Sequence, residues 1–315
     1  MKAFFITSYG GPEVMRYGDL PDPSTVRGEV LVAVKAASLN PLDFKIRRGD
    51  FRIVTGSRFP KILGSDFAGI VKEVDRGVSG FEPGDAVYGS TLLHLRKQGA
   101  HAGFIPVAAG RVHAIPNGIS FEEAASLPVA ALTALNGLRL CGDLAGRTVL
   151  INGATGGVGH FALQIAKVQG ALVTAVCSTR NTDLARELGA DAVIDYTSQD
   201  VIQARQVFDI VFDAHGGLGF EKASRILTPN GAYATPLPTP NVLVHLLWRK
   251  LIGGRRIVAA NMRARPEDYA ALEMLIRERK VKPVIGAILP LHDASQAFAA
   301  LEGGRVRGKI VLGME

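Results

Sequence analysis

The chain has 315 residues with 36 glycines and a formal net charge of +7; 47% of the residues are hydrophobic and 21% are charged. This length exceeds what one hydrophobic core usually fills, so two domains are expected, and the composition excludes a disordered chain. The two cysteines, Cys141 and Cys177, exclude a disulfide framework and a four-cysteine zinc site, which favours a reducing compartment.

No segment predicts a targeting or membrane-spanning sequence. The apolar run at the N-terminus, Ala3 to Ile6, is shorter than the hydrophobic region of a secretory signal. His245 interrupts the apolar stretch from Val242 to Trp248, which is far shorter than a membrane span. We therefore expect a soluble, cytoplasmic protein with no transmembrane segment.

The positive charge permits contact with nucleic acid or an anionic membrane, but scattered, solvated Lys and Arg side chains explain it equally. The local concentration is Arg249-Lys250 followed by Arg255-Arg256, after an apolar stretch. A surface attachment is most expected there, and a helix end facing water is the ordinary alternative. No specific nucleic-acid contact is expected, because no aromatic-and-basic recognition motif accompanies the charge.

Short extended runs separated by Gly and Pro occupy the first third of the chain. The predicted strands are Glu29 to Ala37, Gly69 to Val74, Asp85 to Tyr88 and Phe104 to Ile115. Their spacing predicts a small all-β unit. Ser120-Phe121-Glu122-Glu123 then matches a capping box and predicts a helix to about Leu140. We place the domain boundary at that capping box.

From Thr148 onward, apolar runs alternate with helical stretches, which predicts βαβ units and a parallel sheet. The expected strands are 149–152, 172–177, 192–195 and 208–212, and the expected helices are 158–168 and 182–188. Val149-Leu150-Ile151 and Ile210-Val211-Phe212 are apolar without alternation, which is typical of central strands covered on both faces. A helix from Pro266 to Arg279 and a last strand from Lys309 to Leu312 follow.

The segment from Val149 to Gly159 combines a strand, a glycine-rich turn and the start of a helix, the context that a dinucleotide fingerprint requires. Gly156 and Gly157 allow the backbone to approach a pyrophosphate, and Gly159 allows the helix to pack on the strand. Ala154 stands where the first glycine is usual. The expected cofactor contacts here are Ala154, Thr155, Gly156, Gly157 and Val158. A purely structural turn is the alternative for a single match of this kind.

The end of the next strand decides which dinucleotide is expected. NAD-selective sites place an Asp or Glu there, which bonds the ribose hydroxyls. Here the strand ends in Cys177-Ser178-Thr179-Arg180-Asn181, which offers a hydroxyl and a guanidinium suited to a 2′-phosphate. NADPH is therefore the expected cofactor, bound by Ser178, Arg180 and Asn181. Ser178 and Asn181 also suit capping of the following helix, so Arg180 is the discriminating residue.

Four motifs occur in order along the chain: Asn40-Pro41-Leu42-Asp43, Gly64-Ser65-Asp66-Phe67-Ala68-Gly69, Phe81-Glu82-Pro83-Gly84-Asp85-Ala86-Val87-Tyr88-Gly89 and the Ala154 to Gly159 loop. Together they resemble the medium-chain dehydrogenase/reductase superfamily, and more closely its quinone oxidoreductase branch. The resemblance covers essentially the full chain. It implies an α/β protein with a GroES-like β-rich catalytic domain, residues 1–120 and 266–315, and a Rossmann doubly wound parallel-sheet domain, residues 121–265. It also implies a homodimer.

The zinc alcohol dehydrogenases of this superfamily carry a Cys near the position of Asn40 and Gly-His-Glu where this chain has Gly64-Ser65-Asp66. The stretch from Ser90 to Gly99 also lacks the cysteines of a structural zinc lobe. Nearby His94, His101 and His113 are expected to be ordinary surface or hydrogen-bonded residues. We therefore expect no metal. Hydride transfer to a quinone or to the β-carbon of an enone is expected to need less help than alcohol oxidation, because hydrogen-bond donors and a final proton can satisfy the delocalised oxyanion that forms.

Asn40 is the first candidate for a hydrogen-bond donor to the substrate or the nicotinamide ribose, and Lys45 is the second, because its ammonium can stabilise an enolate oxygen. The ordinary alternatives are a turn before Pro41 and a solvated cation. The resemblance further places Thr133 and the loop holding His215 near the nicotinamide, Tyr196 near the adenosine phosphate and Lys309 beside the cofactor. Each of three residues has an ordinary alternative. Thr133 can bond back to its own helix, Tyr196 can pack as an aromatic residue at a strand end, and Lys309 can be a charged residue at the start of a strand.

The sequence thus predicts a zinc-independent, NADPH-dependent oxidoreductase that passes hydride to a quinone or an α,β-unsaturated carbonyl compound. One alternative is a carbonyl or alcohol dehydrogenase of the same superfamily, which the missing zinc ligands disfavour. Another is an NADPH-binding sensor or structural protein with a basic surface that contacts RNA or a membrane. The substrate itself is not predicted. Loops such as Phe51 to Pro60 and Pro236 to Leu247 are expected to form the pocket walls, and their sequences carry no pattern that identifies a substrate.

Overall fold

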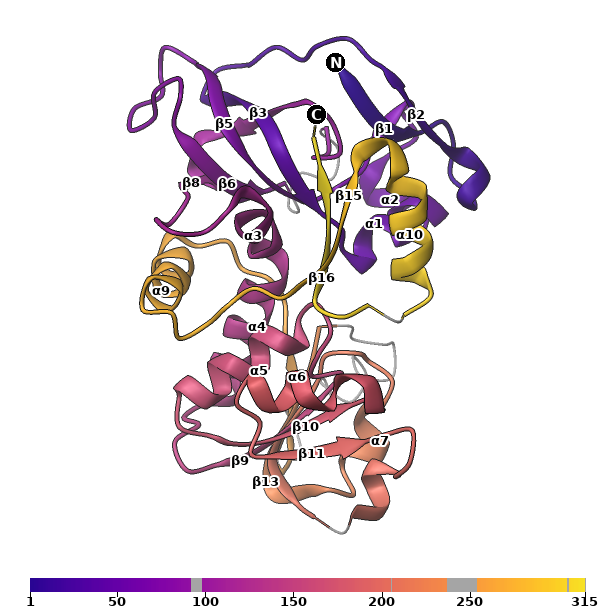
Figure 1. The fold of residues 1–315 in the computed structure, drawn as a ribbon, viewed down its shortest axis with the longest axis vertical. Coiled ribbons are helices and arrows are strands. Elements are labelled where there is room, and N and C mark those ends of the chain that lie inside the picture. Colours follow the sequence, from indigo (N-terminus) through magenta and orange to yellow (C-terminus); the bar gives the residue numbers. More distant parts are fainter. Residues whose placement is uncertain (92–97, 205, 237–253, 305, 315) are drawn as a thin grey trace. The chain divides into compact units, whose positions relative to one another are not determined.

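The computed structural model describes residues 1–91, 98–204, 206–236, 254–304 and 306–314. The chain divides into two compact units (Figure 1). Unit 1 comprises Met1–Val129 and Pro283–Glu315, and unit 2 comprises Ala130–Lys282. Unit 1 therefore contains both ends of the chain.

Unit 1 is rich in strands. They are β1 (Lys2–Ile6), β2 (Met15–Asp19), β3 (Glu29–Ser38), β4 (Lys61–Ile62), β5 (Asp66–Val74), β6 (Ala86–Ser90), β7 (Phe104–Ala108), β8 (Val112–Ala114), β15 (Ile285–Pro290) and β16 (Lys309–Gly313). The helices are α1 (Pro41–Arg48), α2 (Arg52–Thr55), α3 (Phe121–Ser126) and α10 (Ala294–Glu302). The expected all-β unit thus also contains helices, and a 3₁₀ turn at Ala109–Arg111 divides the run predicted as one strand from 104 to 115.

Strand β3 lies at the centre of unit 1. The described strands form a sheet in the order β15-β16-β3-β5-β6-β8, with β7 also paired to β3, and a smaller sheet in the order β2-β1-β4. The C-terminal strand β16 runs antiparallel to β3, with Val311 opposite Ser38. This register brings the start of β16 next to the residues that follow β3. Val32, Phe67 and Ile105 pack in the apolar core of this sheet and are shielded from water, which stabilises the pairing.

Unit 2 alternates strands and helices. The strands are β9 (Thr148–Asn152), β10 (Leu172–Cys177), β11 (Ala192–Asp195), β12 (Phe208–Asp213), β13 (Leu227–Thr235) and β14 (Arg256–Ala259). The helices are α4 (Pro128–Cys141), whose first two residues still belong to unit 1, α5 (Gly159–Val168), α6 (Thr182–Glu187), α7 (Gly219–Ala223) and α9 (Pro266–Arg277). The described strands form one parallel sheet in the order β11-β10-β9-β12-β13-β14. The prediction of a parallel sheet is confirmed.

The central strands of this sheet are β9 and its neighbours β10 and β12. Val149, Leu150 and Ile151 of β9 are fully buried, as are Ile210 and Val211 of β12. Their unbroken apolar pattern in the sequence therefore reflects cover on both faces of the sheet.

The helix expected from 120 to 140 is two helices. The predicted capping box is present: Glu123 N–H donates to Ser120 Oγ at 3.2 Å, and Ser120 N–H donates to Glu123 Oε2 at 2.8 Å. The first helix, α3, then ends at Ser126, and α4 begins at Pro128. Proline has no N–H to continue a helix and fits well at a helix start, which explains the division.

The boundaries between the units also differ from the expected ones, since unit 2 spans 130–282 rather than 121–265. Helix α9 was expected in the catalytic domain, but it belongs to unit 2. The carboxylate of Asp268 in α9 is fully buried and pairs with Arg139 of α4. Lys282 N–H also donates to Gln164 Oε1 of α5 at 2.8 Å. These contacts join the segment after residue 265 to unit 2.

Candidate active site

The glycine-rich turn of unit 2 connects β9 to α5 and is tightly packed where it enters the helix. A Cβ on Gly159 would lie 2.0 Å from the Gly153 carbonyl oxygen, so only glycine fits there. Gly153 itself has a φ of +75°, which favours glycine. Ala154 N–H donates to Val176 O at 3.0 Å, which ties the turn to β10. The turn thus has a fixed shape.

This turn fits the pyrophosphate of a dinucleotide. α5 begins at Gly159, directly after the turn, so the partial positive charge of the helix N-terminus lies at the turn, although the N–H groups of His160 and Ala162 already donate to Gly156 O and Val158 O. A Cβ on Gly156 would lie 3.3 Å from the Gly153 carbonyl oxygen, so the backbone is compact here. A closely approaching backbone and a helix N-terminus both favour a bound anion. Ala154 and Thr155 are buried, whereas Gly156, Gly157 and Val158 are partly exposed and accessible to a ligand.

Asp213 was not among the predicted site residues, yet it organises the strand ends beside this turn. Its fully buried carboxylate accepts hydrogen bonds from the side chains of Asn152 (2.7 Å) and Tyr233 (2.9 Å). It also accepts from the backbone N–H groups of Gly216, Leu218 and Gly219. These bonds fix the loop after β12. The sequence does contain a signal for Asp213, because it is an acidic residue that ends an apolar strand and is soon followed by glycines.

Two residues predicted near the nicotinamide lie in different surroundings. His215 follows Asp213 and is exposed, and its Cβ lies 3.0 Å from the place where a Cβ on Gly153 would stand. The structure thus brings His215 to the glycine-rich turn. Thr133 is buried in α4, with 4% of its surface exposed.

The residues predicted for the 2′-phosphate lie where expected, directly after β10. Thr179–Asn181 form a 3₁₀ turn that leads into α6, and Arg180 is exposed. Asn181 is buried, and its Nδ2 donates to Ser178 Oγ at 3.4 Å, but neither side chain makes the capping hydrogen bond that was the alternative for this pair. Tyr196, one residue after β11, is 60% exposed and is free to face a ligand.

Unit 1 contains a buried polar cluster around Asn40, which we call the Asn40 cluster: Asn40, Asp43, Asp66 and Lys309. Asn40 Nδ2 donates to Asp66 Oδ2 at 2.9 Å, and Lys309 Nζ donates to Asn40 Oδ1 at 2.7 Å and to Leu39 O at 2.9 Å. Lys309 Nζ lies 3.9 Å from Asp66 Oδ2. The structure therefore brings together Asn40 and Lys309, which were predicted separately, and adds the two carboxylates, which were not predicted as site residues.

Burial shifts the pKa values in the Asn40 cluster. Loss of hydration raises the pKa of Asp43 to about 7, helped by the charge of Asp66, while the Asn40 N–H bond to Asp43 opposes the rise. Burial raises the pKa of Asp66 and lowers that of Lys309, and the attraction between these two groups opposes both shifts. Charges buried at such a cost are usually retained for a function or to fix a conformation.

Lys45, the second catalytic candidate, lies in α1, five positions beyond Asn40, and its side chain is partly buried. Asn40 precedes Pro41 and has extended backbone angles, as a residue before proline prefers. Asn40 therefore shapes the chain before Pro41, as its ordinary alternative predicted, and it also belongs to the Asn40 cluster.

The Asn40 cluster does not fit a zinc ion. It offers a carboxamide, carboxylates and an ammonium, without the thiolate or imidazole that zinc prefers. Across the described residues, no three His, Cys, Asp or Glu side chains converge in a way that can hold a metal. His101, expected to be a surface or hydrogen-bonded residue, is fully buried against Phe298, and burial lowers its pKa to about 3. Burial also lowers the pKa of His113, to about 4, and His94 lies outside the described residues.

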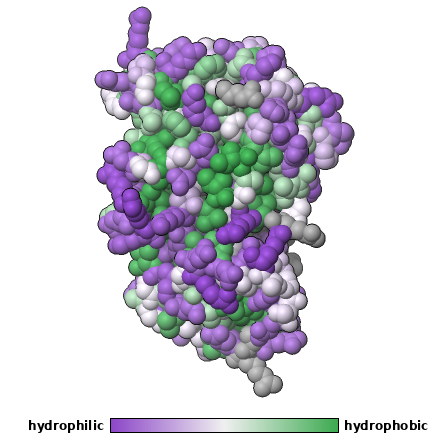
Figure 2. Space-filling view, in the orientation of Figure 1, coloured by the Kyte–Doolittle hydropathy of each residue, from purple (hydrophilic) through white to green (hydrophobic). Residues whose placement is uncertain are grey.

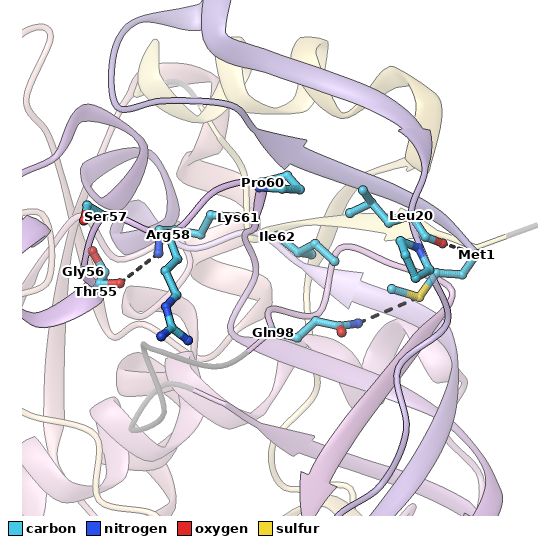
Figure 3. A pocket seen from close by; sticks show the side chains of 11 residues that line it. Met1, Leu20, Thr55, Gly56, Ser57, Arg58, Pro60, Lys61, Ile62 and Gln98 are labelled. Carbon is cyan, nitrogen blue, oxygen red and sulfur yellow. Dashed lines mark hydrogen bonds between the residues drawn. The ribbon is translucent and has the colours of Figure 1, made fainter.

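A hollow of about 740 Å³ opens in unit 1, beside the loop that was expected to form a pocket wall (Figure 3). Thr55, Gly56, Ser57, Arg58 and Pro60 line it from that loop, and Met1, Leu20, Pro21, Lys61, Ile62 and Gln98 complete the lining. Lys61 Nζ donates to Thr55 O at 2.8 Å within this lining. Neither Asn40 nor Lys45 lines this hollow, so it does not contain the candidate catalytic residues.

Two predictions concerned the surface: that no segment spans a membrane, and that a basic segment is the most expected place of surface attachment. No described helix is both long and apolar enough to cross a bilayer. Figure 2 shows hydrophilic side chains over much of the visible face, interrupted by apolar areas. Of the basic segment proposed for surface attachment, Arg249 and Lys250 lie outside the described residues. Arg255 and Arg256 donate to the carbonyl oxygens of Leu227 and Cys141 in unit 2.

Comparisons with known proteins match both units. A family model described as alcohol dehydrogenase GroES-like domain matches residues 26–136, and one described as zinc-binding dehydrogenase matches residues 188–312. The chloroplast envelope quinone oxidoreductase homolog of Arabidopsis thaliana is 34% identical over 99% of this chain and 98% of its own length. The NADPH-dependent alkenal/one oxidoreductase of the same plant is 34% identical over 99% of this chain and 79% of its own length.

A solved structure agrees with these relatives. The quinone oxidoreductase from Coxiella burnetii is 32% identical and superposes with a TM-score of 0.91, covering 100% of this chain and 99% of that one. A GroES-like unit and a Rossmann unit with such relatives define an oxidoreductase, so the predicted fold class is confirmed. The chain belongs to the medium-chain dehydrogenase/reductase superfamily, in its quinone oxidoreductase-like branch.

Proposed function

We propose that this protein is a zinc-independent, NADPH-dependent reductase of quinones or α,β-unsaturated carbonyl compounds. The observation that carries the proposal is the Asn40 cluster. Lys309 Nζ, 2.7 Å from Asn40 Oδ1, places an ammonium among the positions where zinc relatives have metal ligands. A cluster that already contains this cation has no donor set for zinc. The residues of this chain favour a reaction without a Lewis acid.

A nicotinamide dinucleotide fits the turn between β9 and α5. The names of relatives include quinone, alkenal/one and NADPH-dependent oxidoreductases, which agrees with a nicotinamide cofactor and a small-molecule acceptor. Arg180 supports NADPH over NADH, because its guanidinium can bind a 2′-phosphate after β10, where no acid occupies the strand end. The proposed cofactor contacts are Thr133, Ala154, Thr155, Gly156, Gly157, Val158, Ser178, Arg180, Asn181, Tyr196, His215 and Lys309.

Reduced nicotinamide, when bound, supplies the hydride. The acceptor oxygen gains negative charge as hydride reaches the quinone or the β-carbon of the enone, and a proton completes the product. We propose that Asn40 and Lys45 act as donors to this oxygen or hold the cofactor ribose. Donors that are fixed before the reaction stabilise such charge better than water does, because they need no reorganisation.

The first experiment measures NADPH oxidation by the purified protein after chelation of metals. The acceptors are a panel of quinones and short enones, with simple ketones as controls, and NADH is run alongside. Alcohol oxidation with NADP⁺ is measured in the same preparation. Zinc is then added back to a matched sample, and metal content is determined for both.

We expect turnover with NADPH and a quinone or enone that zinc does not increase. Turnover that appears only after zinc is restored, or only with alcohols, contradicts the proposal and favours an alcohol dehydrogenase. Tight NADPH binding without turnover favours a sensor or structural protein. The proposed cytoplasmic homodimer is tested separately, by localisation of the tagged protein and by light scattering after gel filtration.

A further inference from the structure

Asn40 lies between two opposite charges that come from distant parts of the chain. Asp66, at the start of β5, accepts from Asn40 Nδ2, while Lys309, at the start of β16, donates to Asn40 Oδ1. Asn40, Asp66 and Lys309 are all buried, with at most 3% of their surfaces exposed. The carboxamide of Asn40 is therefore held at both ends and shielded from water.

These two charges permit only one orientation of the carboxamide. If the side chain turned over, its N–H groups would face the Lys309 ammonium and its oxygen would face the Asp66 carboxylate. Both contacts would then be repulsive, and two charge-assisted hydrogen bonds would be lost in a buried place. Neutral donors and acceptors also orient an asparagine, but less strongly, because hydrogen bonds to neutral groups are weaker than those to charged groups.

The backbone explains why both charges reach the same amide. Ser38 lies opposite Asp66 in the pairing of β3 with β5 and opposite Val311 in the pairing of β3 with β16. Leu39 N–H then bonds Ile310 O at 3.0 Å, so Lys309 lies beside Leu39 and Asn40. A Cβ on Gly308 would lie 2.0 Å from the Val284 carbonyl oxygen, so glycine is required just before Lys309.

We propose that Lys309 and Asp66 are positioning residues, which hold the Asn40 carboxamide in one orientation and leave its second N–H to serve a ligand. An amide nitrogen carries two hydrogens, and Asp66 accepts one of them. The proposal rests on the proposed role of Asn40 in the reaction. It gives Lys309 a function through Asn40, whereas the sequence predicted only an approach to the cofactor.

The first test needs neither substrate nor cofactor. Protein with ¹⁵N-labelled asparagine side chains is studied by NMR, and the Asn40 amide pair is identified by its loss in Asn40→Ala. The two hydrogens of any carboxamide resonate separately, so the informative quantity is their rate of exchange with water, which we expect to be slow. In Lys309→Met and in Asp66→Asn the pair broadens or exchanges faster, whereas in Lys35→Met, a change on the exposed face of β3, it does not. A pair that exchanges rapidly in the wild-type protein overturns the proposal, even if a variant fails to fold.

The second test separates positioning from stability with a double-mutant cycle. Lys309→Met is expected to lower kcat/KM about tenfold in the wild-type background and less than about twofold in Asn40→Ala, because the oriented amide is then already lost. Thermal unfolding of each variant is measured in parallel. An equal loss of kcat/KM in both backgrounds shows that Lys309 acts independently of Asn40 and overturns the proposal. A wild-type protein without reductase activity refutes the proposed function, but the NMR test still decides whether Lys309 and Asp66 hold the Asn40 carboxamide.

Discussion

The hydroxyl of Thr179 donates a hydrogen bond of 2.5 Å to Asp195 Oδ2 and thereby joins the turn after β10 to the end of β11. Asp195 also accepts from the hydroxyl and backbone N–H of Thr197. The bonds from Thr179 and Thr197 hold the pKa of Asp195 below its usual value. An acidic side chain is thus bonded to the residue before Arg180, and we propose that the Arg180 guanidinium is the cation on which binding of a 2′-phosphate depends.

Replacing Arg180 with alanine tests this dependence. A hydrogen bond to a charged group contributes about 1.5–3 kcal/mol, and solvent screening reduces it at an exposed site, so we expect the Kd for NADPH to rise about tenfold. The Kd for NADH is expected to change less than about twofold, because NADH has no 2′-phosphate. Fluorescence titration with both cofactors measures the effect, and Arg186→Ala, on the neighbouring helix α6, is the matched control. Equal losses for NADPH and NADH assign Arg180 to a structural role instead.

The two glycines of the turn before α5 are expected to respond differently to alanine. Gly159→Ala forces a Cβ to 2.0 Å from a backbone oxygen and is expected to lower the free energy of unfolding by about 1–3 kcal/mol. In Gly156→Ala the new Cβ would lie 3.3 Å from the same oxygen. The free energy of unfolding of this variant is therefore expected to stay within about 1 kcal/mol of wild type, while its affinity for the cofactor falls. Urea unfolding and NADPH titration of both variants provide the comparison. Unchanged NADPH binding by Gly156→Ala is the result that argues against a pyrophosphate at this turn.

Asp43 predicts a pH dependence of stability. Its pKa is about 7 in the folded protein and 3.8 for an ordinary Asp, so the folded state keeps a proton that the unfolded state releases between about pH 4 and about pH 7. The bound proton of Asp43 therefore stabilises the folded state fully below that pH range, and this contribution is lost as the pH rises through it. A carboxamide does not titrate, so Asp43→Asn is expected to gain stability relative to wild type as the pH rises, by up to about 1 kcal/mol per pH unit. Urea unfolding at several pH values measures this difference.

The control for that experiment is Asp50→Asn, an exposed carboxylate just beyond α1. Its stability is expected to run parallel to that of wild type over the same range. If the curve for Asp43→Asn is also parallel to wild type, Asp43 does not hold an extra proton in the folded protein.

Lys45→Met tests the second catalytic candidate. A fixed cation beside the reacting oxygen acts in the transition state, so we expect kcat to fall about tenfold or more with saturating NADPH, while KM changes little. Lys35→Met, which removes an exposed ammonium from β3, is the control and is expected to retain wild-type kcat. Steady-state assays with the best acceptor from the panel measure both. An unchanged kcat shows that the ammonium of Lys45 does not assist the reaction.

Local patterns in the sequence predicted much of unit 2. Strands such as Val149-Leu150-Ile151, the capping box at Ser120 and the turn ending at Gly159 depend on neighbours a few positions apart, so the order of residues determines them. The division at Pro128 also has a local cause, but the long apolar pattern of the two helices concealed it. The place of α9 depends on the pairing of Asp268 with Arg139, which no local pattern reveals.

The sequence by itself determined the strand–turn–helix that fits a dinucleotide and named Asn40 and Lys309 as separate candidates. Only the tertiary structure decided that they touch, because the pairing of β16 with β3 joins residues 269 positions apart. The pairing of β3 with β5 brings Asp66 into the cluster. In the same way, the pairing of β12 with β9 and β13 brings Asn152 and Tyr233 to the carboxylate of Asp213. Buried charges are stable only when such distant partners meet, so their positions depend on the completed fold.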